Sequence, residues 1–201
     1  MGAIETLMSE HRVIERACDA LVAFTDEVRR GSDDKAELGR FVRFIREFAD
    51  AAHHGKEENI LFQAMIDAGF PRDGGPVAVM LMEHDEGRAH VRALAELARQ
   101  EAPWSAQDRQ AIAEEGMGYA SLLRGHIHKE DAILYPMAEQ RLPGSVLSRV
   151  DEDCAAFDDA EARAGRQEPL QKLAEELVAR HAPALGASPA SAHGSAGHHC
   201  F

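Results

Sequence analysis

The sequence predicts an all-α protein whose core is an up-down-up-down four-helix bundle. Apolar residues recur at intervals of three and four along most of the chain, and almost no segment shows the alternation of a β-strand. Clusters of glycine, proline and capping residues divide this pattern into four long stretches with short connections. Long helices joined by short connections fold most simply as antiparallel neighbours around one core.

The bundle is expected within residues 1–143, where breaks in the apolar pattern separate the helices. Each break carries a glycine or a proline, and two breaks also supply serine or aspartate side chains that can cap the next helix. The breaks fall at residues 31–34, 69–76, 103–105 and 142–144, so the first helix is expected from about residue 4 to 30 and the fourth to end near residue 141.

A C-terminal helical extension is expected over residues 144–181. Its apolar pattern is weaker than that of the bundle and predicts one or two helices packed outside it. Alanine, serine, glycine, proline and histidine dominate residues 182–201, a composition typical of a disordered tail. The histidines and Cys200 of this tail could hold a stray metal ion, but a flexible segment is the simpler interpretation.

Composition and charge exclude several classes of function. The 201 residues carry a formal net charge of −13, which argues against a protein that follows nucleic-acid phosphates. No stretch approaches the roughly 20 apolar residues needed to cross a bilayer, and the N-terminus has no apolar signal segment. The three cysteines form neither a disulfide framework nor a zinc motif. We therefore expect a cytoplasmic protein whose partners are small molecules rather than nucleic acid or membrane.

Two ten-residue segments of the chain match each other and carry the chemistry. HHGKEENILF begins at His53, and HIHKEDAILY begins 73 residues later at His126. They share the pattern HxxKExxIL. A histidine and a glutamate four residues apart lie one above the other on a helix, so both can reach the same ion. The repeat therefore predicts a metal site to which each segment contributes one such pair.

The repeat also selects which residues of the first segment form the pair. His53 with Glu57 has the four-residue spacing, and so has His54 with Glu58. In the second segment the equivalent of His54 is Ile127, which cannot bind a metal ion. We therefore favour the first pair and expect the second pair beside the site or at the surface. The repeat is the only observation that separates these alternatives.

Two further histidines lie on apolar stripes of the first and third helices, so every helix of the bundle contributes to the site. Burying four imidazoles and two carboxylates without a cation would be costly. Nitrogen and oxygen donors without thiolate suit iron or manganese better than structural zinc, and six ligands shared by two ions leave positions open for water, oxygen or peroxide. The predicted ligands are His11, His53, Glu57, His84, His126 and Glu130.

These residues resemble the signature of the hemerythrin-like HHE cation-binding family, whose order is H, HxxxE, H, HxxxE. The resemblance covers roughly residues 4–142 and includes the tracts HHGKEENILF, EHDEGRAH and HIHKEDAILYP. It implies a left-handed helical bundle around two iron ions joined by an oxo or hydroxo bridge, with manganese less favoured. The two glutamates would bridge the ions, and two histidines would terminate each ion.

The sequence departs from the oxygen-carrying hemerythrins in its third helix. Those proteins have a second histidine four residues after the first, where this chain has Arg88. They also have an aspartate five residues after the fourth-helix histidine; Asp131 stands there, but Glu130 fits the repeat better. Fewer histidines and more carboxylate favour the ferric state, which weakens the case for reversible oxygen carriage.

The resemblance implies more than one function. The favoured function is a di-iron protein of stress defence that decomposes hydrogen peroxide, with catalase-like or peroxidase activity, or handles nitric oxide or oxygen. One alternative is a non-catalytic protein that senses or stores oxygen or iron. Another is an iron donor for the repair of iron–sulfur clusters.

Overall fold

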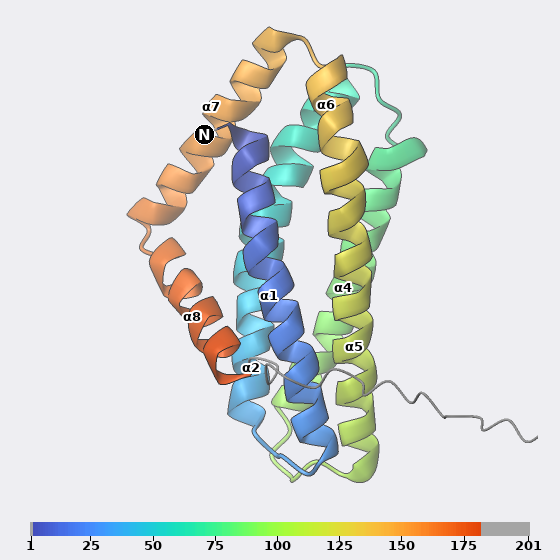
Figure 1. The fold of residues 1–201 in the computed structure, drawn as a ribbon, viewed down its shortest axis with the longest axis vertical. Helices are drawn as coiled ribbons and strands as arrows, with labels where there is room; N and C mark the ends of the chain where they lie inside the picture. Colours follow the sequence, from blue (N-terminus) through green and yellow to red (C-terminus); the bar gives the residue numbers. More distant parts are fainter. Residues whose placement is uncertain (1, 182–201) are drawn as a thin grey trace, which may run out of the picture.

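Four long helical rods form an antiparallel bundle in the computed structural model, which describes residues 2–181 (Figure 1). Each rod packs against its neighbours around one interior, and residues 2–181 contain no strand. The predicted all-α bundle is therefore confirmed. The rods are α1 (Ala3–Arg29); α2 (Lys35–Phe44) continuing to α3 (Phe62–Asp67); α4 (Gly75–Ala98); and α5 (Ala106–Lys129) continuing to α6 (Tyr135–Arg141).

The second and fourth rods contain π-helical segments where the predicted site residues lie. The second rod passes through η1 (Ile45–His54) and η2 (Glu57–Leu61), and the fourth passes through η3 (Glu130–Leu134). A π-helix bonds residues five apart and has a wider turn than an α-helix, and such segments are frequent at functional sites. Both HxxxE segments are helical, as predicted; the first lies largely in π-helical geometry, whereas the second runs along α5 and reaches η3 only at Glu130.

Two apolar clusters fill the bundle, one on each side of the predicted site residues. On α1, Leu7 belongs to one cluster and Ile14 to the other, with the buried His11 between them. On α4 the two clusters are likewise separated at His84. The site therefore occupies a polar layer that interrupts the apolar core.

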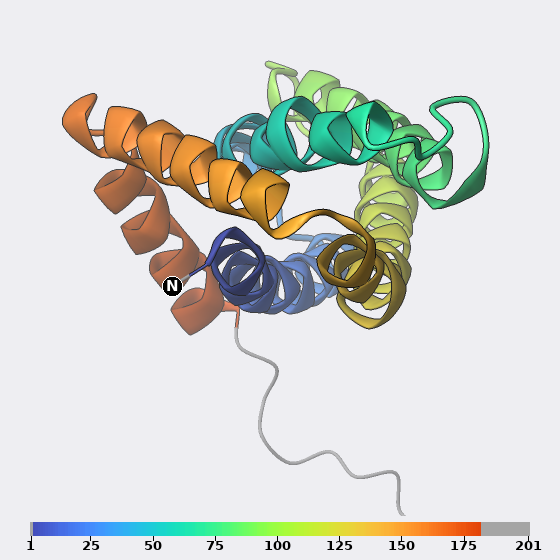
Figure 2. The same cartoon turned by 90° about the horizontal axis from the view of Figure 1, so that it is seen from above.

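Two further helices lie outside the bundle. α7 (Gly144–Arg163) contacts α1 and η2, while α8 (Gln167–Arg180) contacts α1 and α2, so together they cover one side of it (Figure 2). The buried His181 anchors the end of α8, because its Nδ1 lies 2.9 Å from Glu27 and its Nε2 lies 2.9 Å from Glu37. The predicted helical extension is confirmed, whereas the predicted disordered tail and its metal-binding alternative fall outside the described residues.

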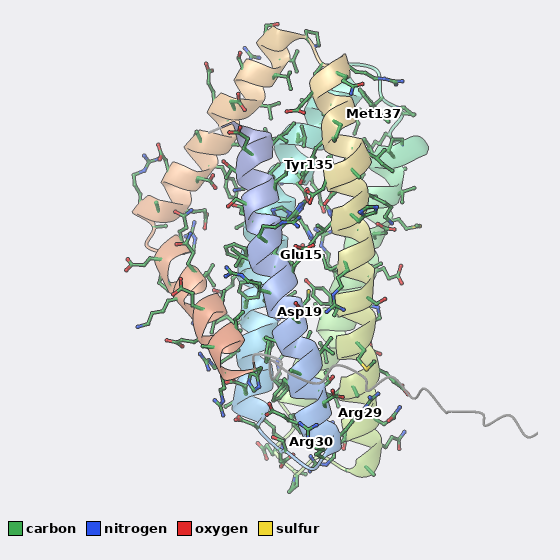
Figure 3. All side chains as sticks on the ribbon, in the orientation of Figure 1. Glu15, Asp19, Arg29, Arg30, Tyr135 and Met137 are labelled. Atoms are coloured by element: carbon green, nitrogen blue, oxygen red, sulfur yellow. The ribbon has the colours of Figure 1, made fainter. Side chains whose placement is uncertain are left out.

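Charged side chains cover the outer faces of the rods, as Glu15, Asp19 and Arg29 illustrate on α1 and Arg30 directly after it (Figure 3). Glu15 follows His11 by four residues, yet it pairs with Arg12 at 2.8 Å instead of joining the site. Among the described helices, none is both long and apolar enough to cross a membrane.

Candidate metal centre

The structure brings all six predicted ligands together in the polar layer of the bundle. Each of them is at most 1% exposed, and each rod contributes at least one. A seventh residue, His54, joins them and is 4% exposed. The side chains of the site are thus buried between the helices of the bundle and converge on one another.

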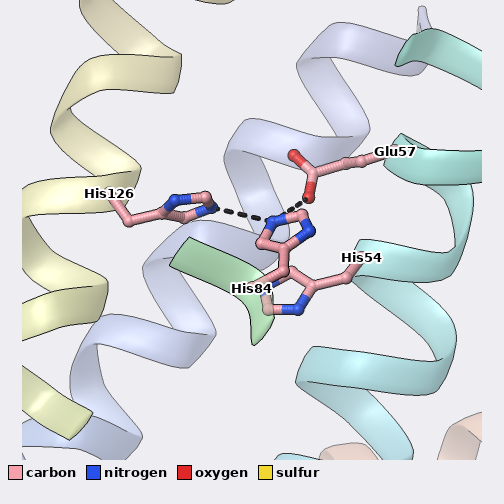
Figure 4. Close-up of side chains that lie close together, drawn as sticks. All are labelled: His54, Glu57, His84 and His126. Carbon is pink, nitrogen blue, oxygen red and sulfur yellow. Dashed lines mark hydrogen bonds and ion pairs between the residues drawn. The ribbon is translucent and has the colours of Figure 1, made fainter. Parts of the chain in front are cut away.

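Seven side chains form two overlapping groups that could each hold a cation. Within each group, one donor atom per residue lies within 4.8 Å of the others, and Glu57 belongs to both groups. Figure 4 shows the second group, in which His84 lies between Glu57 and His126. The first group is His11, His53, Glu57 and Glu130, and the second is His54, Glu57, His84 and His126.

The two glutamates each face histidines of both groups. Glu57 Oε2 lies 3.7 Å from His53 Nε2 and 3.5 Å from His84 Nε2. Glu130 Oε2 lies 3.2 Å from His11 Nε2, and its Oε1 lies 3.2 Å from His126 Nε2. Glu130 is therefore placed to bind one cation through each of its oxygens. Glu57 faces both groups through the same oxygen, Oε2, while its Oε1 accepts a hydrogen bond from Tyr135.

An outer layer of carboxylates orients four of the histidines. Each imidazole meets a carboxylate through Nδ1, so with the proton on that nitrogen the opposite Nε2 is free to face the centre. This arrangement is typical of metal-binding histidines, because it fixes both the tautomer and the ring orientation. The pairs are His11 with Asp131 (2.7 Å), His53 with Glu10 (2.8 Å), His84 with Glu58 (2.7 Å) and His126 with Glu83 (3.0 Å).

The lysine shared by the two repeated segments holds this outer layer in place. Lys56 is buried and binds Glu10, and it also binds Asp158 of α7 at 2.8 Å. Lys129 binds Glu83 in the same way. Burial opposes a charge on Lys56, but the Glu10 and Asp158 carboxylates outweigh that cost and raise its pKa. The HxxKE pattern therefore supplies both the histidine–glutamate pair that faces the centre and the lysine whose ammonium group holds an outer carboxylate in place.

Several nitrogen and oxygen atoms of the two groups lack a partner, and a bound cation would provide one. Both nitrogens of His54, both oxygens of Glu130 and one oxygen of Glu57 are buried without a hydrogen-bond partner among the described residues. A buried polar group left in this state costs about 1–3 kcal/mol. Several such atoms in one place are unusual. Their nitrogen and oxygen chemistry fits one or two divalent or trivalent cations well.

The pKa shifts of the two glutamates also indicate a site for a cation. Burial and the nearby Glu130 charge raise the pKa of Glu57 well above its usual range. Burial also acts against ionisation of Glu130, but His11 and His126 outweigh it and hold the pKa of Glu130 low. One oxygen of Glu57 and one of Glu130 lie within 4.8 Å of each other. Two buried carboxyls this close resist being ionised together unless a positive charge compensates them.

His54 is the site residue that sequence reasoning missed. The repeat placed it beside the site or at the surface, because its equivalent is Ile127; the structure instead stacks its ring on His84, with centroids 3.7 Å apart. Burial and the neighbouring His84 lower its pKa to about 3, so the ring is neutral and able to bind a cation. Its spacing of three residues from Glu57 was the signal that could have found it.

Tyr135 is a second polar residue whose contacts the sequence did not reveal. Its hydroxyl donates a hydrogen bond to Glu57 at 2.5 Å and lies 3.3 Å from His11 Nε2. The equivalent residue of the first repeat is Phe62, whose ring stacks near His84 at 5.9 Å. The two groups are therefore chemically different: one has the phenol of Tyr135 nearby, and the other has the additional imidazole of His54.

Arg88 and Asp131 stand at the two positions where oxygen-carrying hemerythrins have a histidine and an aspartate. Both lie outside the two groups of potential ligands. Arg88 binds Asp50 at 2.8 Å and Glu58 at 2.6 Å, so it fixes the outer carboxylate of His84. Asp131 is itself the outer carboxylate that meets His11, at 2.7 Å from its Nδ1. However, His54 brings the number of inner histidines to five. This count weakens the argument that too few histidines are present for reversible oxygen carriage.

Comparison with known proteins agrees with this geometry. The chain matches the family described as the hemerythrin HHE cation binding domain over residues 2–138, which include all seven residues of the two groups. Uncharacterized proteins of Mycobacterium bovis and Mycobacterium tuberculosis are 27% identical to it over 183 residues, covering 86% of this chain and 68% of theirs. The chain belongs to the hemerythrin HHE cation-binding domain family.

Proposed function

We propose that this protein holds two iron ions and decomposes hydrogen peroxide. The observation that carries the proposal is a cavity of about 160 Å³ whose wall includes His54 and His84. The exposed side chains of Arg46 and Arg92 also line it, so the cavity connects the second donor group to the surface. A molecule as small as hydrogen peroxide can therefore reach the site from solvent.

The donor set supports iron as the metal. Five imidazoles and two carboxylates, without thiolate, suit iron or manganese, and the family resemblance favours iron. Four donors in each group leave positions free on an ion that prefers six. When bound, a pair of iron ions would supply a store for the two electrons that peroxide decomposition exchanges.

The reaction is a disproportionation. One hydrogen peroxide molecule gives up two electrons and two protons and leaves as dioxygen. A second molecule accepts the same two electrons and two protons, its O–O bond breaks, and two water molecules form. The protein must therefore admit peroxide, release dioxygen, and keep proton-carrying groups beside the site.

Residues of this chain suit those tasks. The Tyr135 hydroxyl holds a proton in contact with Glu57, and Asp50 with Arg88 lines the solvent-connected cavity. Water and protons can thus reach the site.

Iron-loaded protein is expected to release dioxygen from hydrogen peroxide in a ratio of one to two. An oxygen electrode measures the product, and metal-free protein is the control, with iron content determined on the same sample. A stable, reversible oxygen adduct without peroxide turnover would contradict the proposal and favour an oxygen carrier or sensor. Turnover no faster than that of free iron at the same concentration would also contradict it.

A further inference from the structure

We propose that Asp158, in the C-terminal helix α7, is a positioning residue for the predicted ligand His53. It acts through Lys56 and Glu10, so that docking of α7 and binding of a cation by the first donor group depend on each other. The inference rests on the part of the proposed function that places a cation beside His53, and it needs no peroxide chemistry. It gives a role at the centre to a residue beyond the family match, which ends at residue 138.

A continuous chain of charged contacts leads from α7 to the first donor group. Asp158 accepts a hydrogen bond from Lys56 Nζ at 2.8 Å. The same ammonium group donates to Glu10 Oε1 at 2.5 Å, and the other oxygen of Glu10 lies 2.8 Å from His53 Nδ1. Displacement of one member leaves the next without a partner. A change at Asp158 therefore reaches the imidazole through two side chains, one from the second rod and one from α1.

The burial of Lys56 is what makes Asp158 necessary. Lys56 is 1% exposed, so water contributes little to solvating its ammonium group. A buried charge is costly unless it is paired and hydrogen-bonded. An ammonium group has three N–H donors, and Glu10 and Asp158 each accept one of them. Without Asp158, the buried cation keeps a single carboxylate partner, which favours its movement toward solvent and away from Glu10.

The second half of the internal repeat does not need this third member. Lys129 binds Glu83 as Lys56 binds Glu10, but the side chain of Lys129 is 37% exposed. Among the described residues Lys129 pairs with no second carboxylate, because water can hydrate it instead. Asp158 is therefore an asymmetric addition, and it ties the first donor group to the C-terminal extension.

α7 has other contacts with the bundle, so Asp158 is not what holds the helix in place. Val150, Cys154 and Asp158 follow one another at intervals of four and share one face of α7. Val150 and Cys154 are buried in an apolar cluster of the bundle. Asp151 accepts a hydrogen bond at 2.6 Å from the backbone N–H of the first residue of α1. Asp158 stands where an apolar side chain would continue the buried face, and its carboxylate meets Lys56 instead.

Cobalt(II) is the probe for this coupling, because its binding to metal-free protein is measured without any peroxide turnover. Asp158→Asn preserves the size of the side chain and removes its charge. We expect one of two cobalt ions to bind about tenfold more weakly, at the lower end of the ~10–100-fold cost of losing an outer partner of a metal ligand. Asp158→Glu, which restores the carboxylate, should regain most of the affinity. The matched control is Asp159→Asn, at the exposed next position of α7, which should keep the parent affinity.

A double-mutant cycle with Lys56→Met tests whether Asp158 acts through the ammonium group. Methionine keeps a flexible, unbranched side chain and removes the charge, so this variant should lose affinity for one cobalt ion by itself. Two residues that act in one chain are not additive. Asp158→Asn is therefore expected to cause little further loss of affinity when Lys56 has already been replaced.

Binding of cobalt should in turn hold α7 more firmly, because a coupling between two events is reciprocal. Amide hydrogen exchange over residues 154–163 is expected to slow by up to about tenfold when cobalt is added to the parent protein. The slowing should be lost in Asp158→Asn and kept in Asp159→Asn. The measurement on the parent protein requires no substitution, so it tests the coupling even where a variant folds poorly.

Equal cobalt affinities in the parent and Asp158→Asn proteins would overturn the inference. A loss that Asp159→Asn reproduces, or that persists in full beside Lys56→Met, would also overturn it, because the effect would then come from overall charge or from packing. So would unchanged exchange of α7 in the cobalt-loaded parent. A parent protein that binds no cobalt refutes the cation site itself, whereas a parent that binds two ions without these effects refutes only the role of Asp158.

Discussion

Replacement of Glu57 by alanine is expected to abolish binding of both cations, lowering the iron content of reconstituted protein from about two per chain to almost none. Glu57 is the residue common to the two donor groups, and it faces His53 on one side and His84 on the other. Loss of a partner in the outer layer of a metal site typically costs about 10–100-fold in affinity, so loss of a shared inner ligand should cost more.

The same substitution should leave the fold intact. Removing a buried carboxyl that lies close to Glu130 relieves the repulsion between the two acids, which partly offsets the cavity left behind. Glu47→Ala, at an exposed position of the same rod, is the matched control and should keep its iron. Retention of both irons in folded Glu57→Ala protein, measured by metal analysis, would contradict the proposed shared ligand.

His54→Leu is expected to have opposite effects on metal binding and on the stability of the metal-free protein. Leucine cannot bind iron, so the second group loses an imidazole, and iron content should fall to about one per chain. In the metal-free protein, leucine replaces a buried ring that has no hydrogen-bond partner for either nitrogen. The free energy of unfolding should therefore rise by about 1–3 kcal/mol.

Chemical denaturation of the metal-free protein and metal analysis of the reconstituted protein measure the two effects on one variant. The measurements belong above the ordinary histidine pKa of ~6.5, so that protonation of the unfolded chain does not contribute. His128→Leu, at an exposed position of the fourth rod, controls for the loss of a histidine. A His54→Leu variant that keeps two irons would show that the repeat was right to exclude this residue.

The sequence was sufficient to predict the bundle and six of the seven inner residues, because each depends on local spacing. Helix ends follow capping residues that the structure confirms: Ser105 accepts a hydrogen bond from the backbone of Asp108, and Asp34 accepts one from Glu37. His11 was found because an imidazole in phase with an apolar stripe must face the core. No knowledge of tertiary structure was needed for these inferences.

The remaining features depend on contacts between helices or on irregular helix geometry. The carboxylates that orient the histidines come from other rods, as Glu10 does for His53, so spacing within one helix cannot reveal them. His53 and His54 are the last two residues of the π-helical segment η1, whose wider turn helps both rings face inward. A sequence pattern based on α-helical spacing therefore assigns only one of them to the site.

The internal repeat extends further than its ten-residue segments. At the same offset, Glu10-His11 corresponds to Glu83-His84, and each of these glutamates meets the histidine of the following rod. The repeat thus describes the symmetric part of the site. It fails where the two halves differ, at His54 against Ile127 and at Tyr135 against Phe62, and those differences give the two donor groups distinct chemistry.

Anomalous X-ray diffraction at the iron absorption edge, on crystals of the iron-loaded protein, tests the di-iron centre most directly. We expect two peaks inside the bundle, one beside His11 and His53 and the other beside His54, His84 and His126, with Glu57 reaching both. A single peak, or peaks only outside the polar layer of the bundle, would contradict the two overlapping donor groups on which the proposed function depends.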